Sequence, residues 1–244
     1  MPHRQLAPVV IDAVVPARNE AATVATVVDA CRRCSAVREV IVVDDGSVDD
    51  TGDRAAAAGA KVIQRGGAAG ALSGSKAHAM EAGVAASDAP ALLFVDGDLL
   101  GLTSDHLDEV CRPFIEGRAT MSVGWFDYGA WNPLVLRLPP TTGERVVPRW
   151  VFEAIPPEKR DGYTIEIMIN EVIAEGRLPT SARIMRGVTH RTKRQKLGRL
   201  EGYRRTWEMF WTLLSLPLTG VVRWRSYWFY LRGLTVESRP AGGR

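Results

Sequence analysis

Two aspartates interrupt an apolar run in the segment LLFVDGDLLGL, residues 92–102. Asp96 and Asp98 follow a buried-looking strand, with Gly97 between them. Asp and Gly are favoured in tight turns, so a turn is one explanation. A metal site is the other, because a glycine lets the chain bend until both carboxylates point to one spot. Two hard oxygen ligands suit Mg²⁺ or Mn²⁺, and the rest of the chain must decide between the two.

The first half of the chain alternates apolar runs with helical patterns. We expect strands at residues 9–15, 39–43, 61–64 and 91–95, and helices at 20–34, from 48–51 onward, at 75–86 and at 103–117. Repeated strand–helix units predict a doubly wound α/β fold with a mostly parallel sheet and helices on both faces. Ligands bind beyond the carboxyl ends of such strands, where Asp96 and Asp98 fall. Asp44 and Asp45 end the second strand in the same way, and turns alone explain two acidic clusters at one edge poorly.

The second half changes character. Residues 124–150 are rich in Pro, Gly and aromatics and predict a strand followed by a long loop, which could act as a lid over an acceptor. Residues 162–176 predict a helix, and residues 182–190 predict a strand that ends at His190. No internal repeat is visible.

Charge is distributed unevenly along the 244 residues. Residues 1–182 carry 17 Lys and Arg against 25 Asp and Glu, whereas residues 183–244 carry 14 against 3. A basic C-terminal quarter favours an anionic partner such as a lipid surface, a phosphorylated substrate or a nucleic acid. Three cysteines, an odd number, argue against a disulfide framework and fit a reducing compartment. The N-terminus does not have the pattern of a signal peptide.

Four motifs occur in the order and spacing of one known family: VVPARNEAATV (14–24), VIVVDDGSVDDT (40–51), GSKAHAMEAGV (74–84) and FVDGDL (94–99). Together they resemble glycosyltransferase family 2, over roughly residues 9–190. The resemblance implies the GT-A fold and the transfer of a sugar from a nucleotide donor. Later segments look more like the small bacterial members, which are polyprenyl-phosphate sugar transferases and glucosyl-phosphoglycerate synthases.

The resemblance also implies roles for residues on the donor side. Asp96 and Asp98 become the metal motif around Gly97, with His190 completing the metal shell and Asp98 counted as catalytic; an exposed loop histidine is the alternative for His190. A divalent cation would neutralise the donor diphosphate and stabilise it as a leaving group. The residues expected around the nucleotide sugar, a UDP- or GDP-hexose, are Pro16, Ala17, Glu20, Asp45 with Asp44 as its alternative, Lys76, Asp96 and Gly97.

The catalytic base and the acceptor are less clear from the sequence. A hydroxyl acceptor needs a carboxylate to take its proton, whereas a phosphate acceptor is already ionised. Glu166 is the best candidate base, since the family has an acidic residue in the matching stretch; a structural role near the metal or a favourable position at a helix start are the alternatives. The loop TTGER offers Thr142, Gly143, Glu144 and Arg145 to hold the acceptor, and Arg suits a phosphate bidentately.

The C-terminal segment combines basic charge with aromatic residues. Residues 207–234 hold eight of the chain's eighteen aromatics, and the longest charge-free stretch, 209–222, is too short to span a membrane. Trp and Tyr beside Arg are typical of a segment that lies in the membrane interface; packing on the protein or a homodimer interface is the alternative. No nucleic-acid motif is present. We therefore expect a GT-A domain at residues 1–195, with a nucleotide-binding half at 9–117 and an acceptor half at 118–195, followed by a helical segment at 196–244.

The expectation from the sequence is a metal-dependent hexosyltransferase in the cytoplasm, peripheral on the inner face of the plasma membrane, with a phosphorylated lipid as acceptor. Transfer to a soluble phosphorylated acceptor such as 3-phosphoglycerate is the second hypothesis, and a catalytically silent membrane-surface scaffold is the third. The sequence gives no support for a dinucleotide-binding domain or a structural zinc site. No G-x-G-x-x-G follows the first strand, and Cys31 and Cys34 fall in an expected helix without enough partners for a structural zinc.

Overall fold

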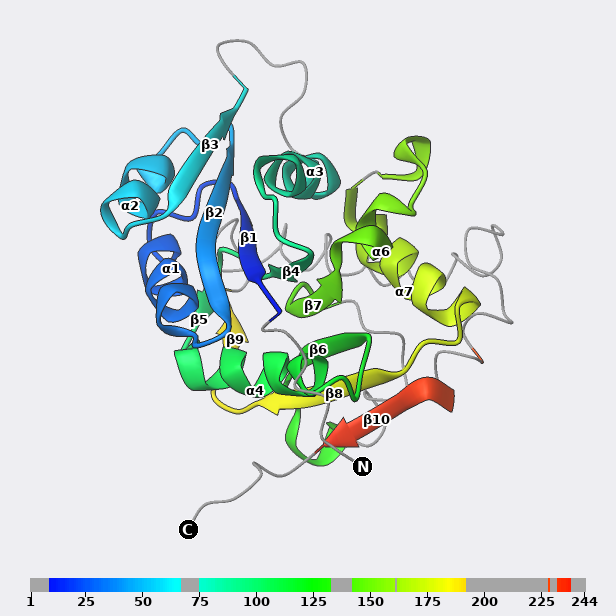
Figure 1. The fold of residues 1–244 in the computed structure, drawn as a ribbon. Helices are drawn as coiled ribbons and strands as arrows, with labels where there is room; N and C mark the ends of the chain where they lie inside the picture. Colours follow the sequence, from blue (N-terminus) through cyan, green and yellow to red (C-terminus); the bar gives the residue numbers. More distant parts are fainter. Residues whose placement is uncertain are drawn as a thin grey trace.

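The fold was analysed in a computed structural model, which describes residues 9–66, 75–132, 142–160, 162–191, 228 and 232–237. Its centre is an eight-stranded sheet in the order β10-β8-β6-β7-β4-β1-β2-β3 (Figure 1). Every neighbouring pair is parallel except the two that involve β7, which is antiparallel to both β4 and β6. The mostly parallel α/β sheet expected from the sequence is thus confirmed.

The strands of the main sheet are β1 Ile11–Ala17, β2 Val37–Asp45, β3 Lys61–Arg65, β4 Ala91–Phe94, β6 Met121–Phe126, β7 Arg145–Pro148, β8 Thr180–Met185 and β10 Leu234–Glu237. A separate two-stranded sheet joins β5 Leu99–Leu100 to β9 Thr189–His190. The central strands β1 and β4 are buried along nearly their whole length. This explains their continuous apolar runs, because helices cover both faces of a parallel sheet.

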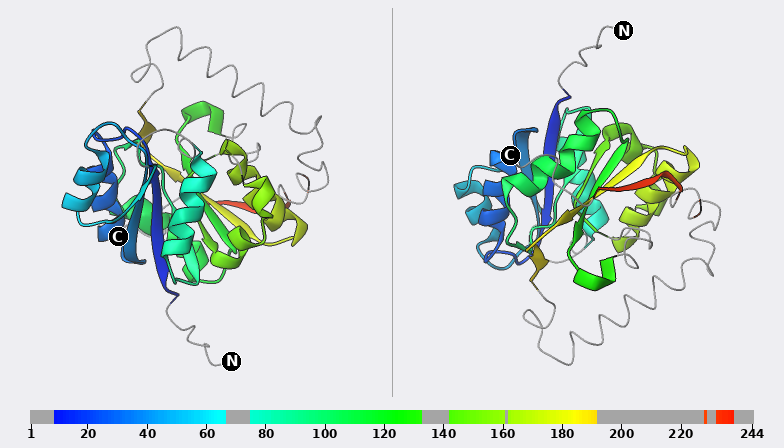
Figure 2. Two further views of the ribbon diagram at one scale, coloured as in Figure 1. Left: turned by 90° about the horizontal axis from the view of Figure 1, so that it is seen from above. Right: turned by 90° about the horizontal axis from the view of Figure 1, so that it is seen from below.

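The α-helices are α1 Val24–Arg33, α2 Thr51–Ala57, α3 Lys76–Ala86, α4 Ser104–Ile115, α6 Arg149–Glu153 and α7 Ile165–Glu175. Short 3₁₀ turns occupy η1 Gly129–Trp131, η2 Pro157–Lys159 and η3 Gly162–Thr164. Helices α1, α2 and α4 cover one face of the sheet, and α3, α6 and α7 cover the other (Figures 1 and 2). Each helical layer buries its own apolar cluster against one face of the sheet, so the sheet is packed on both faces.

Cysteines Cys31, Cys34 and Cys111 are all free and buried between α1 and α4. Burial raises the pKa of the Cys31 thiol far above its usual range, as expected for an inert thiol in an apolar setting. Cys31 lies in α1 and Cys34 directly ends this helix, in agreement with the helix expected over residues 20–34.

The prediction of a long loop up to residue 150 was wrong. Residues Arg145–Pro148 form β7, which inserts antiparallel between β4 and β6, and α6 follows directly. The apolar run of β7 is only two residues long, Val146 and Val147, and Pro148 ends it, so the local pattern is too short to signal a strand. Its neighbours on both sides supply the hydrogen bonds that make it one.

The C-terminal segment rejoins the sheet. Strand β10 at Leu234–Glu237 pairs in parallel with β8 and forms one edge. Most of the predicted segment 196–244 lies outside the described residues, so the domain boundary at residue 195 stays a prediction. Among the described helices, none is long and apolar enough to cross a membrane.

Candidate active site

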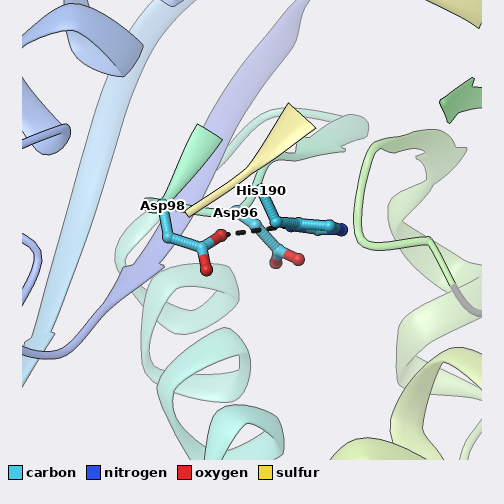
Figure 3. A group of neighbouring side chains, drawn as sticks. All are labelled: Asp96, Asp98 and His190. Atoms are coloured by element: carbon cyan, nitrogen blue, oxygen red, sulfur yellow. Dashed lines mark hydrogen bonds and ion pairs between the residues drawn. The ribbon is translucent and has the colours of Figure 1, made fainter. Parts of the chain in front are cut away.

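Asp96, Asp98 and His190 come together at the carboxyl end of β4 (Figure 3). Each offers one ligand atom, and the three atoms all lie within 4.8 Å of one another. The Asp98 Oδ1 atom is 3.3 Å from His190 Nδ1. Two carboxylates and an imidazole fit Mn²⁺ well and Mg²⁺ acceptably, with positions left for water and phosphate oxygens. In the described residues no other group of His, Cys, Asp and Glu has this geometry.

The glycine between the two aspartates is needed for close packing against β1. A Cβ atom on Gly97 would lie 3.2 Å from the Ala17 Cβ and 3.3 Å from the Pro16 carbonyl oxygen. Thr23 donates a hydrogen bond of 2.8 Å from its hydroxyl to the Gly97 carbonyl. These contacts hold the turn after β4 directly against the end of β1, so the metal motif and the predicted nucleotide residues Pro16 and Ala17 share one edge.

Strand pairing brings His190 to the aspartates across a long stretch of sequence. In the small sheet Leu99 pairs with His190 and Leu100 with Thr189. Asp98 immediately precedes Leu99, and its carbonyl accepts a hydrogen bond of 2.9 Å from the Arg191 backbone N–H. The His190 ring rests on Phe126, with ring centroids 4.3 Å apart. The register of two short strands therefore sets the geometry of the triad.

The pKa of His190 reflects this acidic setting. Burial lowers the pKa, but the hydrogen bond to Asp98 and the negative charges of Glu144, Asp98 and Asp96 outweigh it, so the pKa lies above the usual value. A proton on the imidazole would therefore compete with a metal ion for the ring nitrogen of His190.

Lys76 connects the metal triad to the predicted base. Its Nζ atom is 2.5 Å from Asp96 Oδ1 and 2.7 Å from Glu166 Oε1. Burial lowers the pKa of Lys76, and the charges of Asp96 and Glu166 raise it by more, so the ammonium stays charged. Ser75 caps α3 through the His78 backbone N–H and also accepts a hydrogen bond of 3.3 Å from the Gly162 N–H. This cap ties the start of α3 to the turn before α7, which positions Lys76 and Glu166.

Glu144 is a second buried carboxyl group beside the triad. It is fully buried, and burial together with the charge of Asp96 raises the pKa of Glu144 to about 7, although the Thr142 hydroxyl, His190 and Lys76 oppose the rise. One carboxyl oxygen accepts a hydrogen bond from Thr142 Oγ1, and the other has no partner among the described residues. A charged group that enters the site would therefore change the protonation of Glu144.

The TTGER loop places Gly143 next to the metal motif and buries Arg145 inside the protein. Gly143 lies against Asp96, because a Cβ atom on this glycine would be only 2.5 Å from the Asp96 carboxyl carbon. Arg145 is instead fully buried and donates to the carbonyl oxygens of Thr142 and Glu166 and to the Asn170 side chain. Its guanidinium is engaged by the protein, whereas the sequence suggested a grip on the acceptor.

The predicted nucleotide residues lie at the ends of β1 and β2. Asp44 and Asp45 are each only 4% exposed, and Glu20 is 8% exposed. Asp44 Oδ1 accepts from the Ser47 N–H at 2.9 Å, and Asp45 Oδ1 forms an ion pair of 2.9 Å with Arg65. The structure gathers these acidic groups at the same sheet edge as the triad, and their contact with a nucleotide stays a prediction.

Sequence reasoning missed three supporting residues: Thr23, Arg65 and Asn170. Each acts through a hydrogen bond or ion pair to a site residue that is 20 to 74 positions away in the chain. A lone threonine in a helix start or a lone arginine at a strand end carries no local signal for such a contact. The helix pattern around Asn170 did predict α7, and a polar residue among its buried apolar positions was the only hint.

The chain matches the model of the family "Glycosyl transferase family 2" over residues 12–173. Glucosyl-3-phosphoglycerate synthase of Mycobacterium tuberculosis (strain CDC 1551 / Oshkosh) is 38% identical over 120 residues, which cover 48% of this chain and 37% of that protein. The synthase of Mycolicibacterium paratuberculosis is 31% identical over 191 residues, which cover 64% of this chain and 57% of that protein. The chain therefore spans between about a third and three fifths of the length of these relatives.

Solved structures of the M. tuberculosis synthase have the same fold. One in complex with Mn²⁺, UDP-glucose and phosphoglyceric acid has a TM-score of 0.63 and 27% identity over 75% of this chain and 72% of that one. Another, with Mg²⁺ and UDP, has a TM-score of 0.69 and 25% identity over 84% of this chain and 78% of that one. The metals in these relatives agree with the Mg²⁺ or Mn²⁺ expected from the sequence, and the GT-A fold is confirmed. By its family match, its sheet and its clustered aspartates, this chain belongs to glycosyl transferase family 2.

Proposed function

We propose that the protein transfers a hexose, with glucose from UDP-glucose as the first candidate, to a soluble phosphorylated acceptor of the 3-phosphoglycerate kind. The observation that carries the proposal is the Asp96–Asp98–His190 cluster at the sheet edge, with the Lys76 ammonium on its acidic side. Relatives with a phosphoglycerate acceptor support the acceptor class. The lipid acceptor, favoured first from the sequence, has no such support, and most of the segment that suggested it lies outside the described residues.

The residues of the site divide the chemistry among them. A metal ion held by Asp96, Asp98 and His190 would neutralise the donor diphosphate and stabilise it as it leaves. Lys76, whose ammonium lies beside Asp96, would add a buried positive charge near the same phosphates and add to that stabilisation. As the bond between the sugar and the diphosphate breaks, a bond to the acceptor hydroxyl oxygen would form, and we assign Glu166 as the carboxylate that would accept the hydroxyl proton.

The test is a transfer assay with matched acceptors. Purified protein is incubated with Mn²⁺, UDP-glucose and either 3-phosphoglycerate or a short polyprenyl phosphate, while released UDP and the glycosylated product are measured. We expect product only with the soluble acceptor, and a lower rate when GDP-glucose replaces UDP-glucose. Product with polyprenyl phosphate alone would overturn the acceptor assignment. Absence of transfer with every donor and acceptor, despite Mn²⁺-dependent UDP binding, would instead support a silent relative.

A further inference from the structure

We infer that Arg145 is a positioning residue, which holds the Thr142–Glu144 turn and the first turn of α7 at a fixed separation across the active site. This inference rests on the proposed function, because it assigns Arg145 a part in the same transfer. It also changes the role that the sequence suggested for Arg145, which was to bind the acceptor.

Arg145 is the largest side chain that is fully buried in the described part of the protein. It begins β7, where it pairs with Phe94 of β4 on one side and with Val123 of β6 on the other. Phe94 is two residues before Asp96, so Arg145 lies in the sheet directly below the metal motif. A guanidinium at this depth has been removed from water and is stable only if the protein satisfies its donors.

The guanidinium satisfies its donors with groups from two different segments. Nε and Nη2 both donate to the Thr142 carbonyl oxygen, at 3.2 and 2.5 Å. Nη1 donates to the Glu166 carbonyl oxygen and to Asn170 Oδ1, each at 3.0 Å. One rigid, planar fork therefore links the loop before β7 to the start of α7. A bidentate grip on an acceptor phosphate would require breaking these bonds.

Each of the two linked segments contacts or carries a group proposed to act in the transfer. On the loop side, Gly143 lies against the carboxylate of Asp96. On the helix side, the Glu166 carboxylate pairs with Lys76, which also pairs with Asp96. Arg145 thus closes a ring of contacts that runs from the metal motif through Lys76 and Glu166 and back through the loop. The separation between Asp96 and Glu166 depends on both the ammonium in the site and the guanidinium beneath it.

A lysine at position 145 could not replace this arrangement. Its single ammonium could reach the Thr142 carbonyl or the Glu166 carbonyl but could not span both as the planar guanidinium does. One segment would then move relative to the other, and displacements near 1 Å at a reacting group can cost roughly a hundredfold in rate. The substitution keeps the charge, so a loss would come from geometry.

The experiment compares Arg145→Lys with Arg149→Lys by steady-state kinetics and thermal melting. Arg149 is a suitable control, because it is partly buried and bridges Glu153 and the Ser87 carbonyl, but away from the site. We expect Arg145→Lys to lower kcat at least tenfold and to change the KM of the phosphorylated acceptor less than threefold. Arg149→Lys should leave both constants unchanged. A large rise in acceptor KM with kcat retained would return Arg145 to acceptor binding and overturn the inference.

A double-mutant cycle with Glu166→Gln separates positioning from a general loss of structure. If Arg145 acts through Glu166, the Arg145→Lys change should cost much less in the Glu166→Gln background than in the wild-type protein. If Arg145→Lys lowers kcat by the same factor in both backgrounds, the inference is overturned. If Arg145→Lys fails to fold, Asn170→Ala is used instead, because it removes one hydrogen-bond acceptor of the guanidinium. We expect Asn170→Ala to lower kcat, and an unchanged kcat would contradict the inference. If the wild-type protein does not use 3-phosphoglycerate, the proposed function is wrong but the inference can still be tested. The double-mutant cycle then measures the rate at which UDP is released by hydrolysis of UDP-glucose.

Discussion

The donor half and the acceptor half of the site are held together by different forces. From β1 to β4, parallel strands buried between two helical layers end at one edge, and this strand packing places Asp44, Asp45 and Asp96 at that edge. From β6 to α7, the site depends on buried charges: Lys76, at the start of α3 in the donor half, pairs with Glu166 of α7, and Arg145 joins the loop before β7 to that helix. Regular strand geometry therefore fixes the first half, whereas a few charged side chains fix the second.

The comparison predicts where single substitutions do the greatest damage. A residue of the donor half that binds ligand can be removed without loss of the fold, because packing holds its strand. A cation that pairs with the acceptor half, as Lys76 and Arg145 do, has a structural and a chemical role, so its removal should harm both stability and chemistry. The expected effects below run from the largest to the smallest.

Asp98→Ala should abolish Mn²⁺-dependent binding of UDP-glucose and leave the melting temperature of the free protein nearly unchanged. Asp98 follows β4 outside the apolar core, so its loss would remove a proposed metal ligand and little packing. Isothermal titration with UDP-glucose in the presence and absence of Mn²⁺ measures the effect. The control is Asp53→Ala on the exposed side of α2, which should bind as the wild-type protein does. Undiminished Mn²⁺-dependent binding by Asp98→Ala would refute the metal site.

Lys76→Met should reduce both folding stability and turnover. Without the ammonium, the carboxylates of Asp96 and Glu166 face each other at low exposure, and breaking a buried pair in this way costs about 3–5 kcal/mol. Urea unfolding should show the loss, and added Mn²⁺ should recover part of it by binding to Asp96. Lys61→Met removes a half-exposed ion pair with Glu39 and should cost less than about 1 kcal/mol. Equal costs for the two variants would mean that Lys76 does not hold the acceptor half together.

The same division explains what the sequence could predict. Most strands and the Asp96–Gly97–Asp98 turn follow from local patterns, since apolar runs mark the strands and turn residues mark their ends, whereas the place of His190 beside the aspartates was implied by the family resemblance. Strand β7 and the contacts of Lys76 and Arg145 did not follow, because each depends on partners far away in the chain. Arg145 looked like an anion-binding residue, since the sequence shows its charge but not its burial. Electrostatic contacts between segments become visible only when the topology is known.

His190 should make Mn²⁺ affinity depend on pH. A metal ligand nitrogen must be free of its proton, and the pKa of His190 is raised by Asp98 and the neighbouring carboxylates. As pH falls through this raised pKa, protonated imidazole competes with the metal, so affinity falls by up to about tenfold per pH unit, beginning above the usual histidine pKa of roughly 6.5. Titration of Mn²⁺ between pH 5.5 and 8.5 measures the slope. In His190→Gln the affinity should be lower at high pH and the slope flatter over this range, and an unchanged slope would exclude His190 as a ligand.

Trp228→Ser should have the smallest effect and bears on the C-terminal segment. Trp228 is 54% exposed, and the Arg232 guanidinium lies 4.8 Å from the centre of its ring. An exposed cation–π contact contributes only about 0.5–1 kcal/mol, so the melting temperature should fall by a few degrees at most. Under the proposed function, transfer to a soluble acceptor should stay at the wild-type rate, and neither protein should sediment with anionic vesicles at physiological salt. Sedimentation of the wild-type protein that weakens with salt and is reduced by Trp228→Ser would show that this ring reaches lipid. The basic C-terminal quarter would then hold the acceptor half at a membrane surface, and a lipid phosphate would replace phosphoglycerate as the acceptor to test first.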